Sequence, residues 1–269
     1  MSKLLYTKRS RIAYLTLNRP EAKNAIDPEL HQLLWDAWED FRDDDSVDVA
    51  ILTGSGDAFC AGADLKTYIP PWIDPPATPQ RVRANVATGI GGLTRGLHRI
   101  YKPVIAAVNG WALAGGLETA LACDIRIASE RAMFGSFEAR RGYHHGDGGI
   151  VRLVDVCGAG MALEMLLTAE PIDAQRALQC NMVARVVRHE DLMEAAETTA
   201  RQILRNSQRA VRSAKETILD VIGRPLDEQL RIEALNGYSS ADPAETKALL
   251  ARFYDKTDAG RAGSRENPL

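Results

Sequence analysis

The fold can be predicted from one stretch, residues 102–129, which reads KPVIAAVNGWALAGGLETALACDIRIAS. Its first part, residues 103–108, is short, continuous and apolar, as expected of a buried strand that ends at the turn Asn109-Gly110. Residues 112–122 then have a helical pattern with a glycine-rich first turn, and residues 125–128 form a further short strand. Short strands that alternate with helices are typical of an α/β protein.

The same alternation continues on both sides of this stretch. Strands are predicted at residues 12–17, 49–54 and 183–187, a helix begins at Pro28 behind a cap-like Asp27, and helical patterns cover residues 150–157, 160–167, 173–179 and 190–205. From Ser207 onward the pattern is helical throughout. We therefore predict an α/β core of residues 1–205 and a helical C-terminal region of residues 206–269.

Two segments interrupt the alternation. Five prolines crowd residues 70–80, so we expect neither regular helix nor strand there, and a helical pattern weakened by four glycines resumes over residues 80–101. Residues 134–149 form a second irregular stretch, rich in Gly, His and charged side chains. Loops of the first kind commonly cover a site or move.

Composition excludes several classes of protein. With 33 Lys and Arg against 36 Asp and Glu, the formal net charge of the 269-residue chain is −3, which argues against nucleic acid or an anionic membrane as its main partner. No stretch of about 18 apolar residues would span a membrane, and no leader-like segment begins the chain. The four scattered cysteines have neither disulfide nor zinc spacing, so we expect reduced thiols, a cytoplasmic location and no bound metal.

Two places set glycine-rich backbone against a helix start. They are residues 58–66, AFCAGADLK, and residues 109–118, NGWALAGGLE. Backbone N–H groups at a helix N-terminus lack intrahelical partners and carry positive partial charge, so two such ends together would stabilise an enolate or another oxyanion. On these residues alone, two tight turns that allow close packing remain the simpler interpretation. The chain has no GxGxxG after a strand, no GxxxxGK[ST] and no GxSxG, which disfavours nicotinamide, P-loop and serine-hydrolase chemistry.

An ordered set of motifs resembles the crotonase superfamily, that is, enoyl-CoA hydratases, isomerases and their relatives. The motifs, which span about residues 4–255, are NRP at 18–20 with Asn24-Ala25, FCAGADLK at 59–66, KPVIAAVNG at 102–110, AGGLETALACDIRIAS at 114–129, FGSFE at 134–138 and GDGGIVRL at 146–153. The resemblance implies a spiral of ββα repeats and a helical C-terminal trimerisation region, with trimers often stacked as hexamers. It also implies an acyl-CoA substrate whose thioester oxygen accepts hydrogen bonds from the N–H groups of Ala63 and Gly115.

Two carboxylates set the hydratases of this family apart. The resemblance assigns these positions to Glu118, three residues after Gly115, and to Glu138, which ends the FGSFE motif. Two facing carboxylates can hold one water, take its proton and return a proton to the α-carbon of a 2-enoyl thioester. We expect Glu118 to activate the water and Glu138 to protonate the α-carbon.

Coenzyme A enters as part of the substrate, and no separate cofactor is expected. By resemblance, its nucleotide lies near the segment after the first strand and around the AGAD loop, with contacts from Lys23, Ala25, Ala61, Asp64 and Leu65. Two of these residues have plainer interpretations, since Lys23 can be a solvated turn residue and Asp64 a helix cap.

One stretch departs from the family pattern. His144 and His145 stand where relatives commonly have an apolar residue and a proline, Asp147 stands at a small-residue position, and Phe137 replaces a frequent proline. The two imidazoles could bind a polar acyl group, neutralise a carboxylate or act as an additional acid or base. A metal site is less expected there, because consecutive residues rarely point at one ion.

The leading interpretation is an enoyl-CoA hydratase-like lyase. Alternatives are enoyl-CoA isomerisation or hydrolytic carbon–carbon cleavage of a β-dicarbonyl, using His144, His145 and Asp147, or an inactive acyl-CoA-binding homologue. Retention of both glutamates argues against the inactive homologue.

Overall fold

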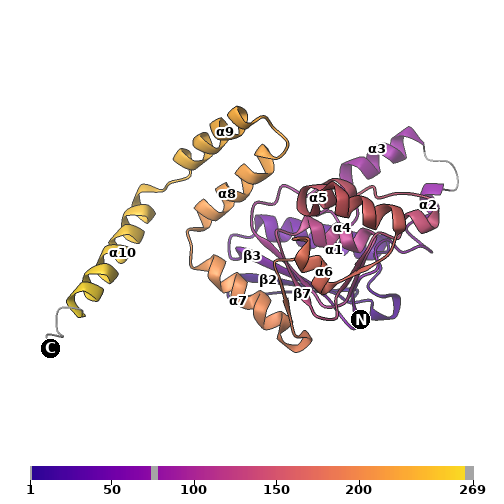
Figure 1. The fold of residues 1–269 in the computed structure, drawn as a ribbon, viewed down its shortest axis with the longest axis horizontal. Coiled ribbons are helices and arrows are strands. Elements are labelled where there is room, and N and C mark those ends of the chain that lie inside the picture. Colours follow the sequence, from indigo (N-terminus) through magenta and orange to yellow (C-terminus); the bar gives the residue numbers. More distant parts are fainter. Residues whose placement is uncertain (1, 74–77, 264–269) are drawn as a thin grey trace. The chain divides into compact units, whose positions relative to one another are not determined.

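The computed structural model describes residues 2–73 and 78–263. The chain divides into two compact units, Met1–Leu204 and Arg205–Leu269, which are described separately (Figure 1). The first unit is a mixed α/β structure, and the second consists of helices. The predicted fold class, an α/β core with C-terminal helices, is confirmed.

Two sheets organise the first unit. The larger has six strands in the order β1 (Leu4–Arg9), β2 (Ile12–Leu17), β3 (Val49–Gly54), β5 (Val104–Val108), β7 (Ile125–Ser129) and β10 (Arg185–Val187). Only the β1–β2 pair is antiparallel. The smaller sheet has the order β4 (Ala58–Cys60), β6 (Trp111–Leu113), β8 (Met133–Gly135) and β9 (Ile172–Asp173).

The chain order explains how the two sheets grow together. Each pair β3–β4, β5–β6 and β7–β8 sends its first strand to the larger sheet and its second to the smaller one, and helices follow each pair. The helices are α2 (Pro70–Ile73) and α3 (Pro79–Thr88), then α4 (Gly115–Ala122), then α5 (Gly149–Thr168). This is the expected succession of ββα repeats, and it sets the β4–α2 and β6–α4 junctions side by side.

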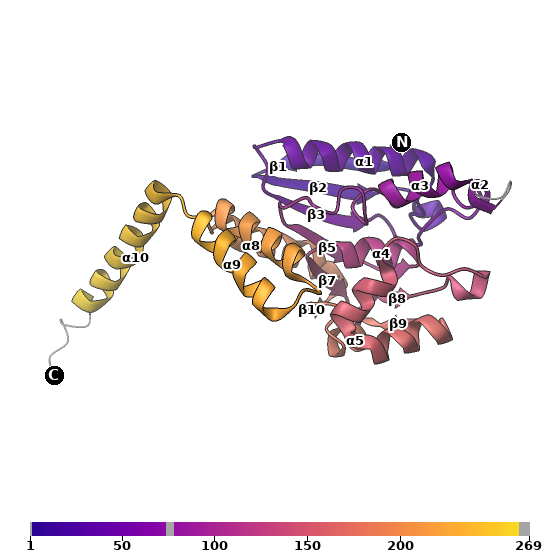
Figure 2. The same cartoon turned by 90° about the horizontal axis from the view of Figure 1, so that it is seen from above.

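Three further helices belong to the first unit, and they pack against its strands. They are α1 (Pro28–Asp43), α6 (Ala174–Gln179) and α7 (Leu192–Leu204), with 3₁₀ turns at Pro20–Ala22, Ala139–Arg141 and His189–Asp191. Figure 2 shows α1 lying alongside β1 and β2. Pro28 is tolerated at the start of α1 because a first-turn N–H needs no helical partner, and the Asp27 side chain accepts the N–H of Leu30 at 2.8 Å.

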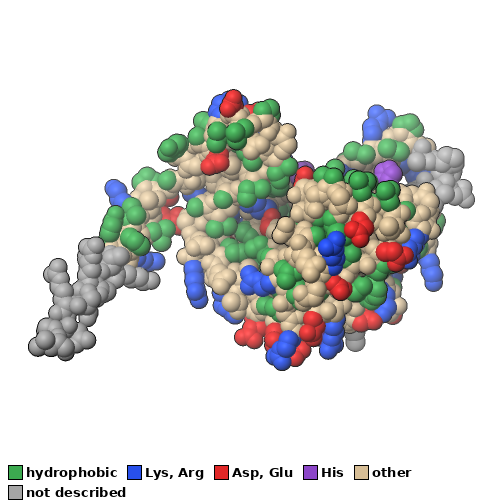
Figure 3. All heavy atoms as spheres, in the orientation of Figure 1, with side chains coloured by type: hydrophobic (Ala, Val, Ile, Leu, Met, Phe, Trp, Pro, Cys, Tyr) green, Lys and Arg blue, Asp and Glu red, His purple; other side chains and the backbone are tan. Residues whose placement is uncertain are grey.

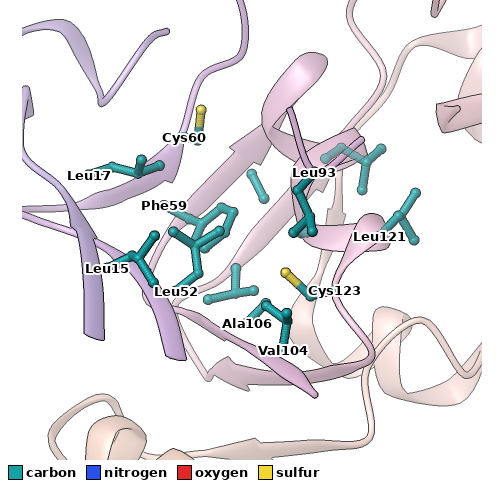
Figure 4. Packing of buried hydrophobic residues seen from close by; sticks show 14 of the residues in the cluster. Leu15, Leu17, Leu52, Phe59, Cys60, Leu93, Val104, Ala106, Leu121 and Cys123 are labelled. Carbon is teal, nitrogen blue, oxygen red and sulfur yellow. The ribbon is translucent and has the colours of Figure 1, made fainter. Parts of the chain in front are cut away.

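The central strands of the larger sheet, β3 and β5, are buried on both faces. Alternate residues of β3, such as Val49 and Ile51, pack in a cluster with Leu192 and Ala196 of α7, whereas Ala50 and Leu52 belong to the main cluster on the other face. Figure 4 shows part of that main cluster, where Leu52, Phe59, Val104 and Leu121 lie close together. Burial on both faces explains why these strands are continuously apolar instead of alternating.

Four sequence-based assignments are wrong, and two of them concern residues 70–101. Residues 70–80 contain helical structure, because Pro70 and Pro71 begin the four-residue α2 and Pro79 begins α3, and proline is tolerated in a first helical turn. Pro75 and Pro76 lie outside the described residues. The helical pattern of residues 80–101 ends at Gly89, whose φ of 69° is incompatible with a continuing helix.

The other two corrections lie around the small sheet. The predicted helix over residues 112–122 begins only at Gly115, because Trp111–Leu113 pairs with Ala58–Cys60 and Met133–Gly135 as β6. The stretch 134–149, predicted irregular, includes the end of β8 and a 3₁₀ turn. The two helical patterns predicted at residues 150–157 and 160–167 are confirmed, because Gly158, with φ 78° and ψ 159°, divides α5 into two helical segments.

The second unit contains α8 (Gln208–Val221), α9 (Leu226–Ser239) and α10 (Pro243–Gly263), and α8 packs against α9. Neither α8 nor α9 contains a fully buried residue. Large apolar side chains are exposed on both helices, for example Leu226 at 66% and Tyr238 at 90%, and hydrophobic side chains gather on this surface in Figure 3. Among the described residues, no helix combines the length and apolar character that a membrane crossing requires.

Candidate active site

A cavity of about 580 Å³ opens in the first unit. Its wall comes from the segment after β2, the β4–α2 loop, the start of α4 and the loop between β8 and α5. Nine residues predicted for the site line it: Ala25, Ala61, Ala63, Asp64, Leu65, Gly115, Glu118, Glu138 and His144. The structure thus gathers most of the candidate residues around one space.

The two glycine-rich junctions meet at this cavity. A Cβ placed on Gly62 would lie 2.8 Å from the backbone nitrogen of Gly115, and one placed on Gly115 would lie 3.4 Å from that of Ala63. A side chain at Gly62 would therefore force the two backbones apart. Its φ of +93° also favours glycine.

The N–H groups of Ala63 and Gly115 are free to bind a ligand. Ile26 pairs with this loop through Gly62 O at 2.7 Å and Asp64 N at 2.9 Å, so the N–H of Ala63 between them points the other way. Gly115 is the first residue of α4 and has no intrahelical acceptor. Across residues 2–73 and 78–263, neither N–H donates to a protein acceptor.

The turn before α4 is strained. Ala114 has φ 52° and ψ −124°, a conformation that L-residues rarely adopt and that costs roughly 1–3 kcal/mol. Two hydrogen bonds hold it, from Ala114 N to Gly135 O at 2.9 Å and from Glu118 N to Ala114 O at 3.1 Å. This turn aims the N-terminus of α4 at the cavity.

Glu118 lies in the first turn of α4 and is 3% exposed. Its Oε1 accepts the N–H groups of Asp147 at 2.8 Å and of Gly149 at 2.9 Å. These bonds fix the carboxylate against the loop that precedes α5. Its Oε2 makes no hydrogen bond to any described residue, so this oxygen is available to a water or a substrate.

Glu138 follows β8 and is equally buried, at 3% exposed. The hydroxyl of Ser136 donates to its Oε2 at 3.3 Å. Like Glu118, it lines the cavity, so two buried carboxylates face the same space.

His145 joins these two carboxylates. Its Nδ1 lies 2.9 Å from Glu138 Oε1 and 3.2 Å from Glu118 Oε1, although neither contact is a straight N–H···O bond, and its Nε2 lies 2.8 Å from Ser136 Oγ. Burial alone would lower the pKa of His145, but the close carboxylates of Glu118 and Glu138 outweigh it and raise the pKa to about 9. The ring is therefore an imidazolium at neutral pH.

Asp147 and two arginines surround this group. Asp147 Oδ1 accepts the N–H of Ile90 at 3.0 Å and lies 3.0 Å from a guanidinium nitrogen of Arg95. Burial, together with the nearby charge of Glu118, raises the pKa of the Asp147 carboxyl. Arg152 donates to Asp147 O at 3.0 Å and to Thr94 O at 2.7 Å, and burial lowers its pKa.

Glu118, Glu138 and His145 are also the set able to share a cation. Within the described part of the chain, their donor atoms form a group that lies within 4.8 Å of one another. Two carboxylate oxygens and an imidazole nitrogen are ligands that zinc accepts. The raised pKa of His145 also favours a protonated ring, which would place a single positive charge between the two carboxylates.

The remaining candidates are placed less centrally. Lys23 is absent from the cavity wall and forms an ion pair with Asp57. Asp64 lines the cavity, accepts the N–H groups of Lys66 and Thr67, and pairs with Arg19 at 3.1 Å. It therefore caps a turn as well as facing the space.

The two adjacent histidines point in different directions. His144 lies at the exposed rim of the cavity, and its Nδ1 is 2.7 Å from the carbonyl of His145. His145 is buried behind the carboxylates and does not line the cavity.

Two residues of the site were not predicted from the sequence. Ser136 lies within the quoted FGSFE motif, but nothing in its pattern assigns it a partner. Arg95 lies in a glycine-interrupted helical pattern typical of a surface helix. The one feature of the sequence that could have pointed to Arg95 is a charged side chain within the glycine-rich stretch of residues 89–96.

Comparison with known proteins gives one consistent result. A model described as enoyl-CoA hydratase/isomerase matches residues 7–261. A crotonyl-CoA hydratase of Syntrophomonas wolfei is 38% identical over 236 residues, 86% of each chain, and an (E)-benzylidenesuccinyl-CoA hydratase of Thauera aromatica is 38% identical over 218 residues, 81% of each chain. The crystal structure of an enoyl-CoA hydratase from Bacillus anthracis superposes with a TM-score of 0.83 at 33% identity, covering 95% of this chain and 97% of that one.

Proposed function

This chain belongs to the enoyl-CoA hydratase/isomerase family, and from that premise we propose that it is a hydro-lyase that adds water across the double bond of a 2-enoyl-CoA thioester. The observation that carries the proposal is the pair of buried carboxylates, Glu118 and Glu138, on the wall of one cavity beside two unpaired backbone N–H groups. General acid–base chemistry on a thioester needs these groups and little else.

The backbone donors serve the thioester oxygen. The N–H groups of Ala63 and Gly115 donate to the carbonyl, where negative charge develops as the enolate forms. Only main-chain atoms are needed, which fits the small residues at both positions. Each such donor contributes roughly 3–4 kcal/mol to the lowering of the barrier.

The two carboxylates divide the transfer of protons. A water held by Oε2 of Glu118 gives its proton to that carboxylate while its oxygen bonds to the β-carbon, and the electron pair of the double bond moves onto the thioester oxygen. The enolate then collapses, and the α-carbon takes a proton from Glu138. The β-carbon thus gains the hydroxyl of water, the α-carbon gains the proton of Glu138, and Glu118 keeps the proton taken from water; no oxidant or reductant is consumed.

The remainder of the substrate lies along the other side of the cavity. The residues of the cavity wall that would contact coenzyme A are Ala25, Ala61, Asp64 and Leu65. Lys23 is not part of this wall and forms an ion pair with Asp57, so any contact with coenzyme A would come from outside the cavity. Coenzyme A is part of the substrate, and we expect no further cofactor.

Assembly and location are also proposals. The exposed apolar side chains of α8 and α9 support a homotrimer, or a hexamer of two trimers, in which these helices become covered. All four cysteines are free thiols, which supports a reducing, cytoplasmic environment.

The decisive experiment follows the loss of conjugated enoyl-thioester absorbance when purified protein meets crotonyl-CoA. We expect rapid loss with the wild type and a loss slower by about 10²–10⁴-fold with Glu138→Gln, because the amide cannot supply the proton. A wild type that binds acyl-CoA without consuming crotonyl-CoA would contradict hydration. Isomerisation or carbon–carbon cleavage would then be tested with a 3-enoyl-CoA and a β-dicarbonyl thioester.

A further inference from the structure

One buried side chain touches both proposed acid–base groups without reaching the cavity. The imidazole of His145 is 1% exposed, and its Nδ1 lies 2.9 Å from Glu138 and 3.2 Å from Glu118. It is held tightly, since a Cβ on Gly149 would lie 2.5 Å from Nδ1. A group in this position acts on the substrate only through the two carboxylates.

We propose that His145 is a positioning residue that carries a proton from Glu118 to Glu138 in each catalytic cycle. The proposal rests on the hydratase function proposed above. It deepens that function by stating how the two carboxylates return to their starting charges.

Hydration leaves a proton in the wrong place. Glu118 gains the proton of the water and Glu138 loses the proton given to the α-carbon, so each turnover requires one proton to move from Glu118 to Glu138. Both carboxylates are buried and line the cavity that the substrate would occupy, so a path through a neighbouring side chain would return the proton without bulk solvent. The Nδ1 of His145 is within reach of an oxygen of each.

The hydrogen bonds around the ring fit an imidazolium. Ser136 accepts from Nε2 at 2.8 Å and donates to Glu138 Oε2 at 3.3 Å, so the Nε2 proton stays in place and holds the tautomer. Nδ1 faces only carboxylate oxygens and is the nitrogen that exchanges its proton. The imidazole thus lies between the two carboxylates, within 3.2 Å of an oxygen of each.

The cycle balances. At rest, Glu118 and Glu138 are carboxylates and His145 is protonated. Nδ1 gives its proton to Glu138, which passes it to the α-carbon, while Glu118 takes a proton from water; Glu118 then returns that proton to Nδ1. The N–H bond of His145 breaks once and forms once, and the net change is the addition of one water to the substrate.

Other charged groups around His145 are consistent with this cycle. On the loop before α5, Asp147 and Tyr143 have raised pKa values, mainly because of burial and with a further contribution from the nearby glutamates. The positive charges nearby are Arg152 of α5, which binds Asp147 O, and Arg95, which pairs with the Asp147 carboxylate. Among the described residues, none of these groups forms a hydrogen bond or an ion pair with the imidazole, and Glu118 and Glu138 are the groups that raise its pKa.

The test replaces the proton carrier and keeps a hydrogen-bond donor. In His145→Asn, the amide nitrogen stands near the position of Nδ1 and donates to the carboxylates, but it cannot accept and release a proton. We expect kcat for crotonyl-CoA hydration to fall about 10–100-fold with KM within about threefold. His189→Asn is the matched control, because His189 also contacts a serine, Ser129, at 3.0 Å but touches no carboxylate of the site; its kcat should equal that of the wild type.

The pH profile gives a second readout. Below about pH 9 the imidazole of His145 carries the proton that it gives to Glu138. Wild-type kcat should therefore fall as the pH rises through about 9. His145→Asn should lack this basic limb. An unchanged kcat, or a basic limb that persists in the variant, overturns the relay.

Nitrogen NMR of the five histidines tests the charge state without any activity. The signal lost in His145→Asn should report a doubly protonated ring at pH 7, and a neutral ring there overturns the proposal. If the wild type fails to hydrate crotonyl-CoA, the proposed function fails, whereas this NMR result is unaffected. If His145→Asn does not fold, Ser136→Ala, which removes the Nε2 acceptor, should show a smaller loss of kcat in the same direction. Activity that is lost with a chelator and restored by Zn²⁺ would instead assign the three side chains to a metal and overturn the relay.

Discussion

The first unit buries charged side chains beside its apolar core, and the second unit exposes large apolar side chains to solvent. In the first unit, Glu118, Glu138 and His145 are each 5% exposed or less. In the second, Leu226 and Tyr238 are 66% and 90% exposed. Each arrangement is the reverse of what stabilises an isolated chain, since burying charge and exposing apolar surface both cost free energy.

The two reversals have different explanations. The buried charges are mutually paired and face a cavity, which indicates that they serve chemistry. The exposed apolar residues lie on α8 and α9 and are the basis of the proposed assembly, in which another subunit would cover them. Substitutions in the first unit should therefore change catalysis more than stability, and substitutions in the second should change assembly.

The largest effect is expected for Glu118→Gln. We predict a fall in kcat of about 10²–10⁴-fold, because the amide cannot take a proton from water. The free energy of unfolding should change by only about 1–2 kcal/mol, since the amide oxygen still accepts the N–H groups of Asp147 and Gly149 and Glu138 still pairs with His145. Steady-state kinetics and urea unfolding measure both. Glu164→Gln, on the exposed side of α5, is the control, and full activity with a large loss of stability would reverse the interpretation of these charges.

Gly62→Ala tests the backbone part of the same region. Its Cβ would lie 2.8 Å from the nitrogen of Gly115, so the two N–H donors should separate and kcat should fall about 10²–10³-fold. Gly56→Ala is the matched control, because Gly56 also has a positive φ, +73°, but lies outside the cavity wall. The atom nearest to its added Cβ would be Pro20 Cβ at 3.1 Å. Both variants should lose some stability, but only the first should lose activity. Equal kcat values for the two would show that the donors are not where the proposal needs them.

The second unit is tested by Leu226→Glu combined with Leu230→Glu. These residues are 66% and 54% exposed and lie one turn apart on α9, so two charges there should prevent a neighbouring subunit from packing. We expect light scattering to show a trimer or hexamer of the 29.4 kDa wild type and monomers of the double variant. The double Met variant should retain the wild-type assembly. A monomeric wild type would remove the contrast between the two regions.

The smallest effect is expected for Thr53→Val, which separates a structural polar group from the catalytic ones. The Thr53 hydroxyl donates to Ala107 O at 2.8 Å, and its loss should cost about 1 kcal/mol of unfolding free energy. Hydration of crotonyl-CoA should be unchanged in initial-rate assays. A fall in kcat beyond twofold would show that polar groups outside the cavity also control the reaction.

The larger sheet was predictable because burial on both faces leaves a strong pattern. Five of its six strands, all except β1, were predicted from the sequence, β2 from alternating apolar and polar residues and buried strands such as β3 and β5 from continuous apolar runs. The strands of the smaller sheet have two or three residues, as in Trp111–Leu113, and are too short to show any periodicity. The α4 start was misplaced for that reason.

The candidate site was predictable as a set of residues but not as a set of contacts. Glu118 and Glu138 were named from motif positions and His145 as a departure from the family pattern, yet nothing in the sequence places one imidazole nitrogen against two carboxylates. That contact depends on the path of the loop between β8 and α5, where Gly149 leaves no room for a side chain beside the ring. Ser136 escaped prediction because its role exists only once this loop is folded.

The order of the larger sheet also bears on synthesis of the protein. β7 (Ile125–Ser129) and β10 (Arg185–Val187) are neighbours, but roughly 55 residues separate them in the chain. At about 5–20 residues per second, a ribosome needs several seconds to supply the last strand. During that interval β7 is an open edge of the nascent sheet, able to pair with another chain. The window for misassembly should therefore lengthen when translation slows between residues 129 and 185.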